Sequence, residues 1–192
     1  MRRGAQIAAA PATALQGILL ADPLRREALL AVAALGLPDC WIGAGFVRDA
    51  VWDHLHGYAT RPPGGDVDVV LFDPAIMDKG VDRRLERQLR SAIPALDWSV
   101  KNQARMHLRN GDGPYGSVAE AMQRWPETAT AVAVRFDAAG EIEINAPFGL
   151  GDLFTLRLRP TSAFRHVRLP IFDERVASKR WLERYSLLKI EK

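Results

Sequence analysis

One stretch decides how this chain folds: Gly64-Gly65-Asp66-Val67-Asp68-Val69-Val70. From Val67 to Phe72 the chain is β-branched or apolar apart from Asp68, which predicts a central, buried strand. Residues two apart on a strand share a face, so Asp66 and Asp68 point the same way, with their backbones about 7 Å apart. Carboxylates entering a buried strand need compensating charge, and Mg²⁺ or Mn²⁺ prefers oxygen ligands. The pair therefore predicts a divalent-metal site, although Asp-x-Asp alone also fits the exposed mouth of a strand.

A glycine turn precedes this strand, at Gly43-Ala44-Gly45. The apolar run from Cys40 to Ile42 leads into the turn, and a helix from Phe46 to about His56 is expected after it. Glycines in such a turn let backbone N–H groups approach a phosphate closely, and a helix N-terminus favours anions. The turn is a candidate phosphate site, and its place before the Asp-x-Asp strand strengthens the metal-site prediction.

Three basic residues are candidates for contacting a phosphate. Arg48 lies one turn into the helix and suits a phosphate or the aspartate pair, but an ion pair with an aspartate of its own helix fits equally well. Lys101 and Arg105 occupy odd positions of a strand expected over residues 97–108, and all the odd positions are polar. That face lies toward a cleft or toward solvent, so both phosphate binding and simple exposure explain these two residues.

Composition limits the class of protein. Of the 192 residues, 48% are hydrophobic and 26% charged, which is ordinary for a globular protein. No apolar run reaches the roughly 18 to 20 residues of a membrane span, so we expect no membrane partner. The single cysteine, Cys40, cannot form an internal disulfide and fits a cytoplasmic location. Residues 1–150 have a net charge of −2 and residues 151–192 a net charge of +5, so the basic tail suits either an anionic partner or a solvated helix face.

The rest of the chain mixes helices with a small sheet. The pattern predicts a helix opened by Asp22 and Pro23, a helix over Val81–Ile93, a capped helix over Ser117–Trp125, a hairpin of Thr130–Phe136 and Glu141–Ala146, and a helix from Asp173 onward. The expected antiparallel pairs place the fold in the α+β class.

The order of glycine turn, helix and Asp-x-Asp strand resembles the signature of the DNA polymerase β nucleotidyltransferase superfamily. The run Gly43–Asp49 looks like the Gly-Gly-x-Val-Arg-Asp run of tRNA CCA-adding enzymes. From about residue 27 onward the chain also resembles a family of small bacterial nucleotidyltransferase-like proteins, through Trp98–His107, Trp125–Thr130 and Ala146–Leu150. The resemblance implies a polymerase-β-like fold, with a small mixed sheet flanked by helices.

The resemblance also implies roles for the residues above. Asp66 and Asp68 would bind metal, and Gly43 to Gly45 would cradle the triphosphate of an NTP. Two features depart from the pattern: Ala44 offers no Ser hydroxyl at the second signature position, and the loop before Asp66 is long for the superfamily. We expect a nucleotidyltransferase-like domain over residues 1–160 and a basic C-terminal helical appendage over residues 161–192, packed on the same domain.

A third carboxylate is usual in the superfamily, on a neighbouring strand, where it serves as a base and a metal ligand. Glu143 is the first candidate, because it shares a face with Glu141 and Asn145 on the strand that the family's order of elements suggests. Asp97, on the polar face with Lys101, is the rival candidate.

These observations predict an enzyme that transfers a nucleoside monophosphate from an NTP to an unknown acceptor, with Mg²⁺ or Mn²⁺. The acceptor class stays open among a small molecule, RNA and protein. The missing Ser hydroxyl keeps open a non-catalytic nucleotide- or RNA-binding module. Small size and the basic tail keep open a regulatory partner protein.

Overall fold

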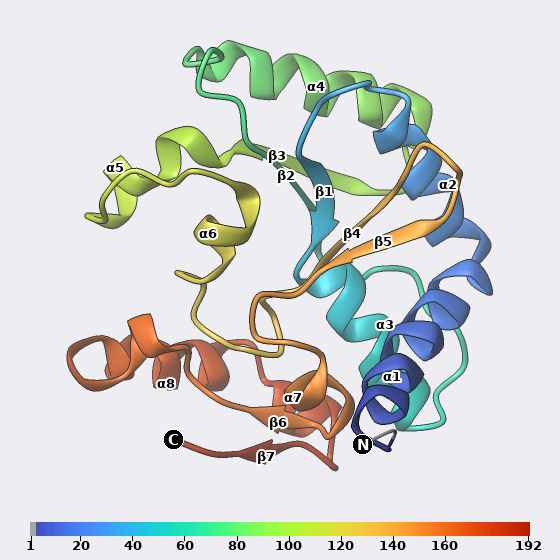
Figure 1. Ribbon diagram of the computed structural model, residues 1–192, viewed down its shortest axis with the longest axis vertical. Helices are drawn as coiled ribbons and strands as arrows, with labels where there is room; N and C mark the ends of the chain where they lie inside the picture. The colour runs from blue at the N-terminus through green and yellow to red at the C-terminus, as the bar shows by residue number, and fades with distance from the viewer. Residues whose placement is uncertain (1–2) are drawn as a thin grey trace.

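A five-stranded mixed sheet forms the centre of the fold (Figure 1). The computed structural model describes residues 3–192, with side chains described from residue 11 onward. The strands lie in the order β3 (Asp97–Asn102), β2 (Asp66–Leu71), β1 (Cys40–Gly43), β4 (Ala133–Phe136) and β5 (Ile142–Asn145). β2 and β3 run parallel, and the other neighbouring pairs run antiparallel. The expected α+β class is confirmed.

Helices cover both faces of this sheet. One face packs against α2 (Pro23–Ala33), α3 (Gly45–Leu55) and α4 (Lys79–Ala92), with α1 (Arg3–Leu20) outside α2 and α3. The other elements are α5 (Met106–Asn110), α6 (Val118–Met122), α7 (Gly151–Phe154), β6 (Arg157–Leu158), α8 (Leu169–Ser178), α9 (Trp181–Arg184), β7 (Lys189–Ile190) and 3₁₀ turns at Gln103–Arg105, Ser162–Phe164 and His166–Arg168. In the described part of the chain, no helix is both long and apolar enough to cross a membrane.

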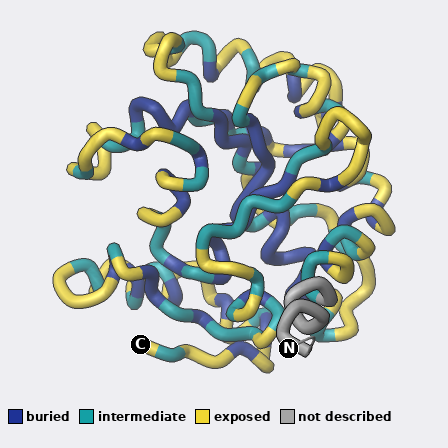
Figure 2. Tube along the Cα trace, viewed as in Figure 1, coloured by how far each residue is buried: buried dark blue, intermediate teal, exposed yellow. Residues whose placement is uncertain are grey.

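Alternation along the strands divides the core in two. Val67, Val69 and Leu71 of β2 point into the larger core, beneath α2 and α3. Figure 2 shows the buried centre that these elements share. On the opposite face lies a smaller cluster formed by Trp41, Val70, Val118, Met122, Ala131 and Ala133. Because Asp66 and Asp68 alternate with the buried valines, they belong to this second, less covered face.

The strand register places Asp68 between the two neighbouring strands. It lies opposite Gly43 of β1 and opposite Ser99 of β3. Beyond Gly43 the chain leaves the sheet at the end where β2 begins, because β1 and β2 are antiparallel. The glycine turn and the start of α3 therefore lie toward Asp66, while Val70 lies on the opposite side of Asp68.

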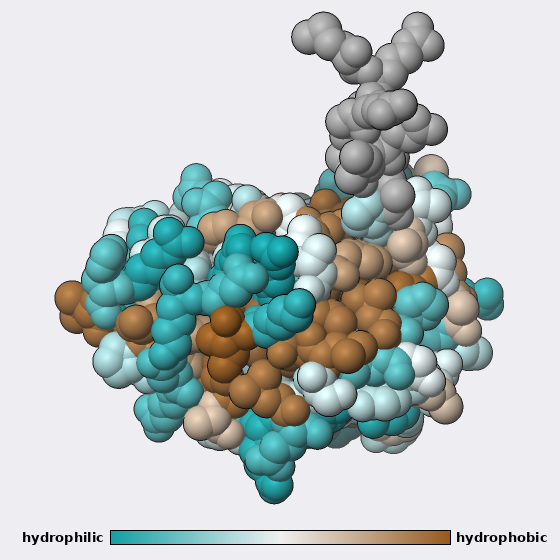
Figure 3. Space-filling model, turned by 90° about the horizontal axis from the view of Figure 1, so that it is seen from below, coloured by the Kyte–Doolittle hydropathy of each residue, from teal (hydrophilic) through white to brown (hydrophobic). Residues whose placement is uncertain are grey.

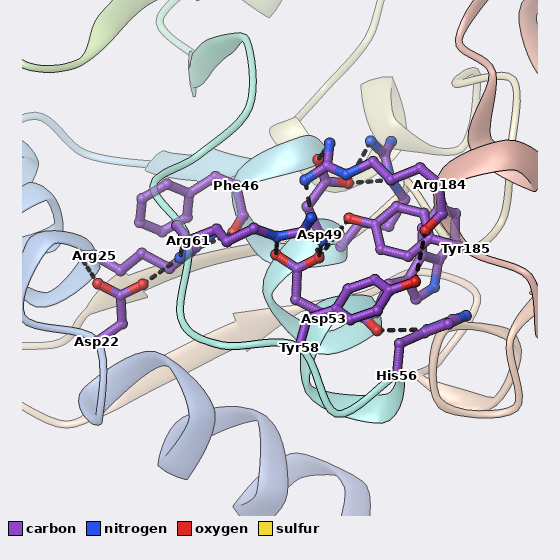
Figure 4. Close-up of polar contacts among 12 residues, drawn as sticks. Asp22, Arg25, Phe46, Asp49, Asp53, His56, Tyr58, Arg61, Arg184 and Tyr185 are labelled. Carbon is purple, nitrogen blue, oxygen red and sulfur yellow. Dashed lines mark hydrogen bonds and ion pairs between the residues drawn. The ribbon is translucent and has the colours of Figure 1, made fainter.

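Buried ion pairs and hydrogen bonds hold α3 in place (Figure 4). Asp53 of α3 pairs with Arg61 and accepts a hydrogen bond from the Tyr185 hydroxyl at 2.9 Å. Arg25 of α2 donates its Nε to the carbonyl oxygen of Phe46 at 3.1 Å. Charges at such depth are tolerated because each has a partner. These contacts fix the helix whose N-terminus carries the glycine turn.

The C-terminal segment, residues 161–192, packs closely on α3 and on the chain around Glu127. Trp181 and Tyr185 contact Trp52 of α3 edge-on, with ring centroids 6.0 and 5.2 Å apart. Arg175 of α8 forms an ion pair at 2.7 Å with Glu127, which is fully buried. The parallel pairing of β6 with β7 also links chain on either side of residue 160. The segment thus contributes core side chains as well as surface.

Much of the positive charge of the tail is already paired. Its ion pairs join Arg168 to Asp112, Arg175 to Glu127, Arg180 to Glu183, Arg184 to Asp49 and Asp53, and Lys192 to Asp173. Seen from the side of β6, β7 and α8, the surface mixes hydrophilic and hydrophobic patches (Figure 3). Leu187 and Ile190 are exposed in this segment. Ion pairs within the protein therefore neutralise part of the basic charge of the tail.

Two expected elements end differently. The strand expected to reach residue 108 stops at Asn102, because this fully buried side chain accepts from the Ala104 N–H at 3.0 Å and donates to the carbonyl oxygens of Asp73 and Ile76 at 2.7 and 2.8 Å. The expectation of a strand over residues 103–108 was wrong, since a 3₁₀ turn and α5 follow. The helix expected from Asp173 onward is two helices, separated by Arg180 in the left-handed region.

Local capping signals in the sequence are confirmed. The Asp22 carboxylate accepts from the Leu24 and Arg25 amides at 3.0 and 3.1 Å, which opens α2. The Ser117 hydroxyl accepts from the Glu120 amide at 3.1 Å, which opens α6. Both helices therefore begin at the residues that the capping patterns in the sequence predict.

Candidate functional site

Asp66 and Asp68 share one side of β2, at the start of the strand. Asp66 is exposed, whereas Asp68 is partly buried between β1 and β3. Burial, and secondly the charge of Asp66, raises the pKa of Asp68 from 3.8 to about 6. Three nearby cations oppose this rise in the pKa: Arg48, Lys101 and Lys179. The protein therefore holds a carboxylate whose charge its own surroundings do not fully compensate.

The two aspartates fit a hard divalent cation. Neither carboxylate has a hydrogen bond or an ion pair within 4 Å with another residue whose side chain the structure describes. Among the same residues, no three His, Cys, Asp or Glu side chains gather in a way that would hold a metal ion. Mg²⁺ typically takes one or two protein carboxylates and completes its shell with water and substrate phosphates. The donor set of Asp66 and Asp68 suits a cation that arrives with a nucleotide.

The glycine turn joins β1 to α3 through Ala44, which has a positive φ of 53°. Non-glycine residues in this conformation store strain. The Ala44 N–H donates to the Val132 carbonyl oxygen at 3.0 Å, so this amide is occupied. α3 has no side-chain N-cap, and the first N–H groups of a helix have no acceptor within it. The amides of Gly45 and Phe46 are therefore the ones that a phosphate can contact.

Gly43 is required by close packing. A Cβ at this position would lie 3.1 Å from the Val132 carbonyl oxygen, 3.2 Å from the Ala133 Cβ and 3.3 Å from the Trp125 ring. A Cβ at Gly45 would meet the Arg48 side chain at 3.5 Å, an ordinary contact. The first glycine thus lets the Trp125 ring approach the sheet, and the second leaves the start of α3 open.

Arg48 is buried and its guanidinium is held by protein groups. Its Nη2 and Nε contact the Asp49 carboxylate at 2.7 and 3.0 Å, and its Nη1 donates to the Thr130 hydroxyl at 3.0 Å. Its guanidinium carbon lies 4.5 Å from the centre of the Trp181 ring. Of the two roles predicted for Arg48, the structure shows the ion pair within α3. Its charge still acts on Asp68 through space.

Lys101 and Arg105 differ in their position relative to Asp68. Lys101 lines the same cavity as Asp68 and pairs with Glu86 at 3.1 Å. Arg105 is buried, pairs with Asp82 and donates to the Ile76 carbonyl oxygen at 2.9 Å. It lines a cavity beside α4 that Lys101 also borders, but not the cavity beside Asp68, because the strand expected to carry it ends at residue 102. This placement does not support a role for Arg105 in binding the nucleotide.

The two candidates for a third carboxylate also differ in position. Glu143 lies on β5, three strands from β2, and its carboxylate contacts Arg135 Nε at 2.7 Å. Asp97 lies opposite Asp66 on β3, but its carboxylate contacts Arg90 at 3.2 Å. The structure does not bring Glu143 together with the aspartate pair, and the register places Asp97 nearer. The residue of β3 opposite Asp68 is Ser99, which carries a hydroxyl.

A cavity of about 450 Å³ opens beside Asp68. Its lining includes residues that sequence reasoning did not assign to the site: Arg109, Asn110, Arg124, Trp125, Phe164, Arg168 and Ile171. Lys179, which acts on Asp68 through space, was also missed. They come from α5, the end of α6 and the C-terminal segment, and no local motif connects them with Asp-x-Asp. The expected appendage thus supplies part of the wall of the site.

Comparison with solved structures relates this arrangement to known proteins. A protein solved by NMR and described as a CCA-adding enzyme head domain is 30% identical, with a TM-score of 0.82, over 93% of this chain and 94% of that chain. A Thermotoga maritima CCA-adding enzyme complexed with tRNA and a CCA-adding enzyme complexed with CTP are each 16% identical, with TM-scores of 0.59 and 0.61. Each match covers 93% of this chain but only 42% and 43% of theirs, so it shows the fold alone. No curated protein matches the chain with significance.

Comparison with models of protein families agrees with these structural matches. A family model described as nucleotidyltransferase matches residues 30–190, which include the glycine turn, both aspartates and most of the C-terminal segment. The implied polymerase-β-like fold is confirmed by the head-domain match. The chain belongs to the nucleotidyltransferase family.

Proposed function

We propose that this protein transfers a nucleoside monophosphate from an NTP to an acceptor hydroxyl or phosphate, with Mg²⁺ or Mn²⁺ held by Asp66 and Asp68. One observation carries the proposal: Asp68 is partly buried beside Asp66, next to the open N-terminus of α3, and has no hydrogen bond or ion pair to any described side chain. A fold that only needed a stable strand would gain nothing from such a carboxylate, because its charge costs free energy until a cation binds. Membership of the nucleotidyltransferase family supports the same reaction class.

The residues have distinct parts in the proposed reaction. An acceptor oxygen forms a bond to the α-phosphorus while the bond from this phosphorus to the bridging oxygen of the β-phosphate breaks, so pyrophosphate leaves and the acceptor loses a proton. A divalent cation supplies charge neutralisation for such a transfer. Asp66 and Asp68 hold the cation, and the amides of Gly45 and Phe46 contact the triphosphate. Lys179 and Lys101 add positive charge around Asp68.

The test measures pyrophosphate release from each of the four NTPs with Mg²⁺ or Mn²⁺, in the presence of RNA, protein and small-molecule fractions of a cell extract. We expect release that depends on both the metal and one fraction, together with a labelled product in that fraction. The doubly substituted Asp66→Asn/Asp68→Asn protein should lose both. Release that survives in the doubly substituted protein would contradict the proposal.

A second function is favoured by one observation, namely that Ser99 and not a third acid lies opposite Asp68. With Glu143 occupied by Arg135, the fold could bind a nucleotide without performing transfer. Calorimetry with each Mg²⁺–NTP separates the two functions. Tight binding without any product in the extract fractions would support the binding module, whereas metal-dependent product excludes it.

A further inference from the structure

We propose that the cavity beside Asp68, lined by Lys101, Arg109, Arg124, Trp125, Phe164 and Arg168, is the acceptor site, and that it takes a small phosphorylated molecule with a flat apolar body. This inference rests on the proposed function, since an acceptor site has meaning only where a nucleotidyl group is transferred. It adds a substrate class that the sequence and the comparisons leave open.

The position of the cavity along β2 separates it from the triphosphate site. The glycine turn and the start of α3 lie toward Asp66, because β1 runs antiparallel to β2 and ends opposite Asp68. The cavity includes Asp68 and Val70 but neither Asp66 nor any residue of the turn. It therefore extends from Asp68 in the opposite direction along the strand. A molecule in this cavity would approach the metal site from the side away from the triphosphate, as an acceptor must.

The walls of the cavity suit a flat apolar group. Val70, Met106 and Ile171 supply aliphatic surface, and Trp125 and Phe164 supply aromatic rings. Trp125 is half-buried and lies against Gly43, so its ring is held in place between the sheet and the cavity. Fixed aromatic surface of this kind binds planar groups at low entropic cost.

Part of the positive charge at the rim of the cavity has no acidic partner among the described side chains. Arg109 and Arg124 form no hydrogen bond or ion pair through their side chains with any residue whose side chain the structure describes, and both are exposed. Arg168 is held in position, since its Nη2 contacts the Asn110 carbonyl oxygen at 3.2 Å and the Asp112 carboxylate at 3.3 Å. Asp68 is the only acidic residue among those that line the cavity.

Together these features define the class of ligand. Unpaired guanidinium groups match phosphate oxygens, which they bind with two parallel hydrogen bonds. The volume of about 450 Å³ is in the usual range for a site that encloses a small molecule. The three arginines come from three separate segments, α5, the end of α6 and the turn before α8, so they surround one region. A phosphomonoester attached to a flat ring would place its ring against the apolar walls and its phosphate beside the arginines at the rim.

The test uses phenyl phosphate as the probe, with phenol and inorganic phosphate as its two halves, and the 192-residue protein without NTP or metal. Binding is followed by ¹H–¹⁵N NMR titration and by Trp fluorescence. We expect phenyl phosphate to bind at least tenfold more tightly than either half and to shift the signals of Trp125 and Arg168. The doubly substituted Arg109→Gln/Arg124→Gln protein should bind it at least tenfold more weakly. Arg87→Gln, an exposed arginine of α4 outside the cavity, is the matched control and should change binding less than twofold.

A second measurement separates this proposal from the first. Binding of a non-hydrolysable Mg²⁺–ATP analogue should change less than twofold in Arg109→Gln/Arg124→Gln. An equal loss for the analogue would reassign the cavity to the triphosphate and overturn the acceptor site, while leaving the proposed transferase intact. Shifts that map to the glycine turn, or no binding of phenyl phosphate, would also overturn it. So would a 5′-phosphorylated oligoribonucleotide that binds tenfold more tightly than its mononucleotide, because the site would then serve RNA.

Discussion

β2 places Asp66 and Asp68, and β5 places Glu143, on the same face of the sheet, but the surroundings of these carboxylates differ sharply. Asp68 lies on a central strand, partly buried, with no hydrogen bond or ion pair to another described side chain. Glu143 lies on an edge strand, is about half exposed, and contacts Arg135 on the neighbouring strand. In the sequence each of the two follows another acid by two positions, Asp66 before Asp68 and Glu141 before Glu143.

The difference shows which surroundings make a carboxylate a candidate metal ligand. An exposed acid with a cross-strand arginine is compensated by that partner and by water, so a cation would gain little. A partly buried acid beside a second acid keeps an unfavourable charge that a cation can relieve. The following predictions test whether this contrast between β2 and β5 holds.

The largest expected effect is on catalysis. Asp68→Asn should lower the rate of metal-dependent nucleotidyl transfer by about 10²- to 10³-fold, because it removes a charged ligand from the reacting centre. The measurement is kcat/KM for pyrophosphate release in the presence of the extract fraction that supports release. Glu143→Gln, measured alongside, should stay within about twofold of the unsubstituted protein, since its carboxylate faces Arg135. Similar losses in both variants would remove the contrast.

Asp66→Asn should have a smaller effect on the rate, about tenfold or more, because Asp66 is exposed and shares the cation with Asp68. It should also lower the pKa of Asp68, since the charge of Asp66 raises that pKa. NMR titration of the Asp68 carboxyl carbon in the metal-free protein measures the change. An unchanged pKa would mean that burial alone sets it.

Stability should respond to Asp68 in the direction opposite to activity. The pKa of Asp68 is raised from 3.8 to about 6 in the folded protein, so between these values the folded state holds a proton that the unfolded state has lost. The free energy of unfolding therefore falls as pH rises through this window. At pH 7.5, metal-free Asp68→Asn should be more stable than the unsubstituted protein by about 1–3 kcal/mol.

Urea unfolding at pH 3.5 and at pH 7.5 measures this linkage. At pH 3.5 the two proteins should agree to within about 0.5 kcal/mol, because both then carry a neutral side chain. Saturating Mg²⁺ with an NTP analogue should reverse the order at pH 7.5, since the ligand stabilises only the protein that binds it. An equal difference at both pH values would show that the effect comes from packing.

The smallest expected effect concerns Glu143 and Arg135. Exposed ion pairs contribute about 0–1 kcal/mol, so Glu143→Gln should change the free energy of unfolding by about 0.5 kcal/mol at most. Arg135→Gln should cost more, because its guanidinium also lies 4.1 Å from the centre of the Trp41 ring. A double-mutant cycle isolates the pair. A coupling above about 2 kcal/mol would show that β5 resembles β2 after all.

Much of the fold followed from local signals. The strand at β2, the helix after the glycine turn and the caps at Asp22 and Ser117 depend on alternation and short-range hydrogen bonds, which the sequence displays directly. The end of β3 did not follow from local signals. It depends on Asn102, whose side chain donates hydrogen bonds to the carbonyl oxygens of Asp73 and Ile76, which are distant in the chain. No periodicity signals a contact of that range.

The candidate site shows the same division between features that follow from local sequence and features that depend on tertiary packing. By itself the sequence determined that Asp66 and Asp68 share a face of a buried strand and follow a glycine turn, since both features come from residues within one short stretch. Only the tertiary structure decided what surrounds them: Arg48 of α3 is occupied by Asp49, Glu143 is three strands away, and Arg168 borders the cavity. The physical reason is the long range, along the chain, of the interactions involved. Burial and charge compensation depend on every segment that packs around a group, and the chain brings those segments together only when it folds.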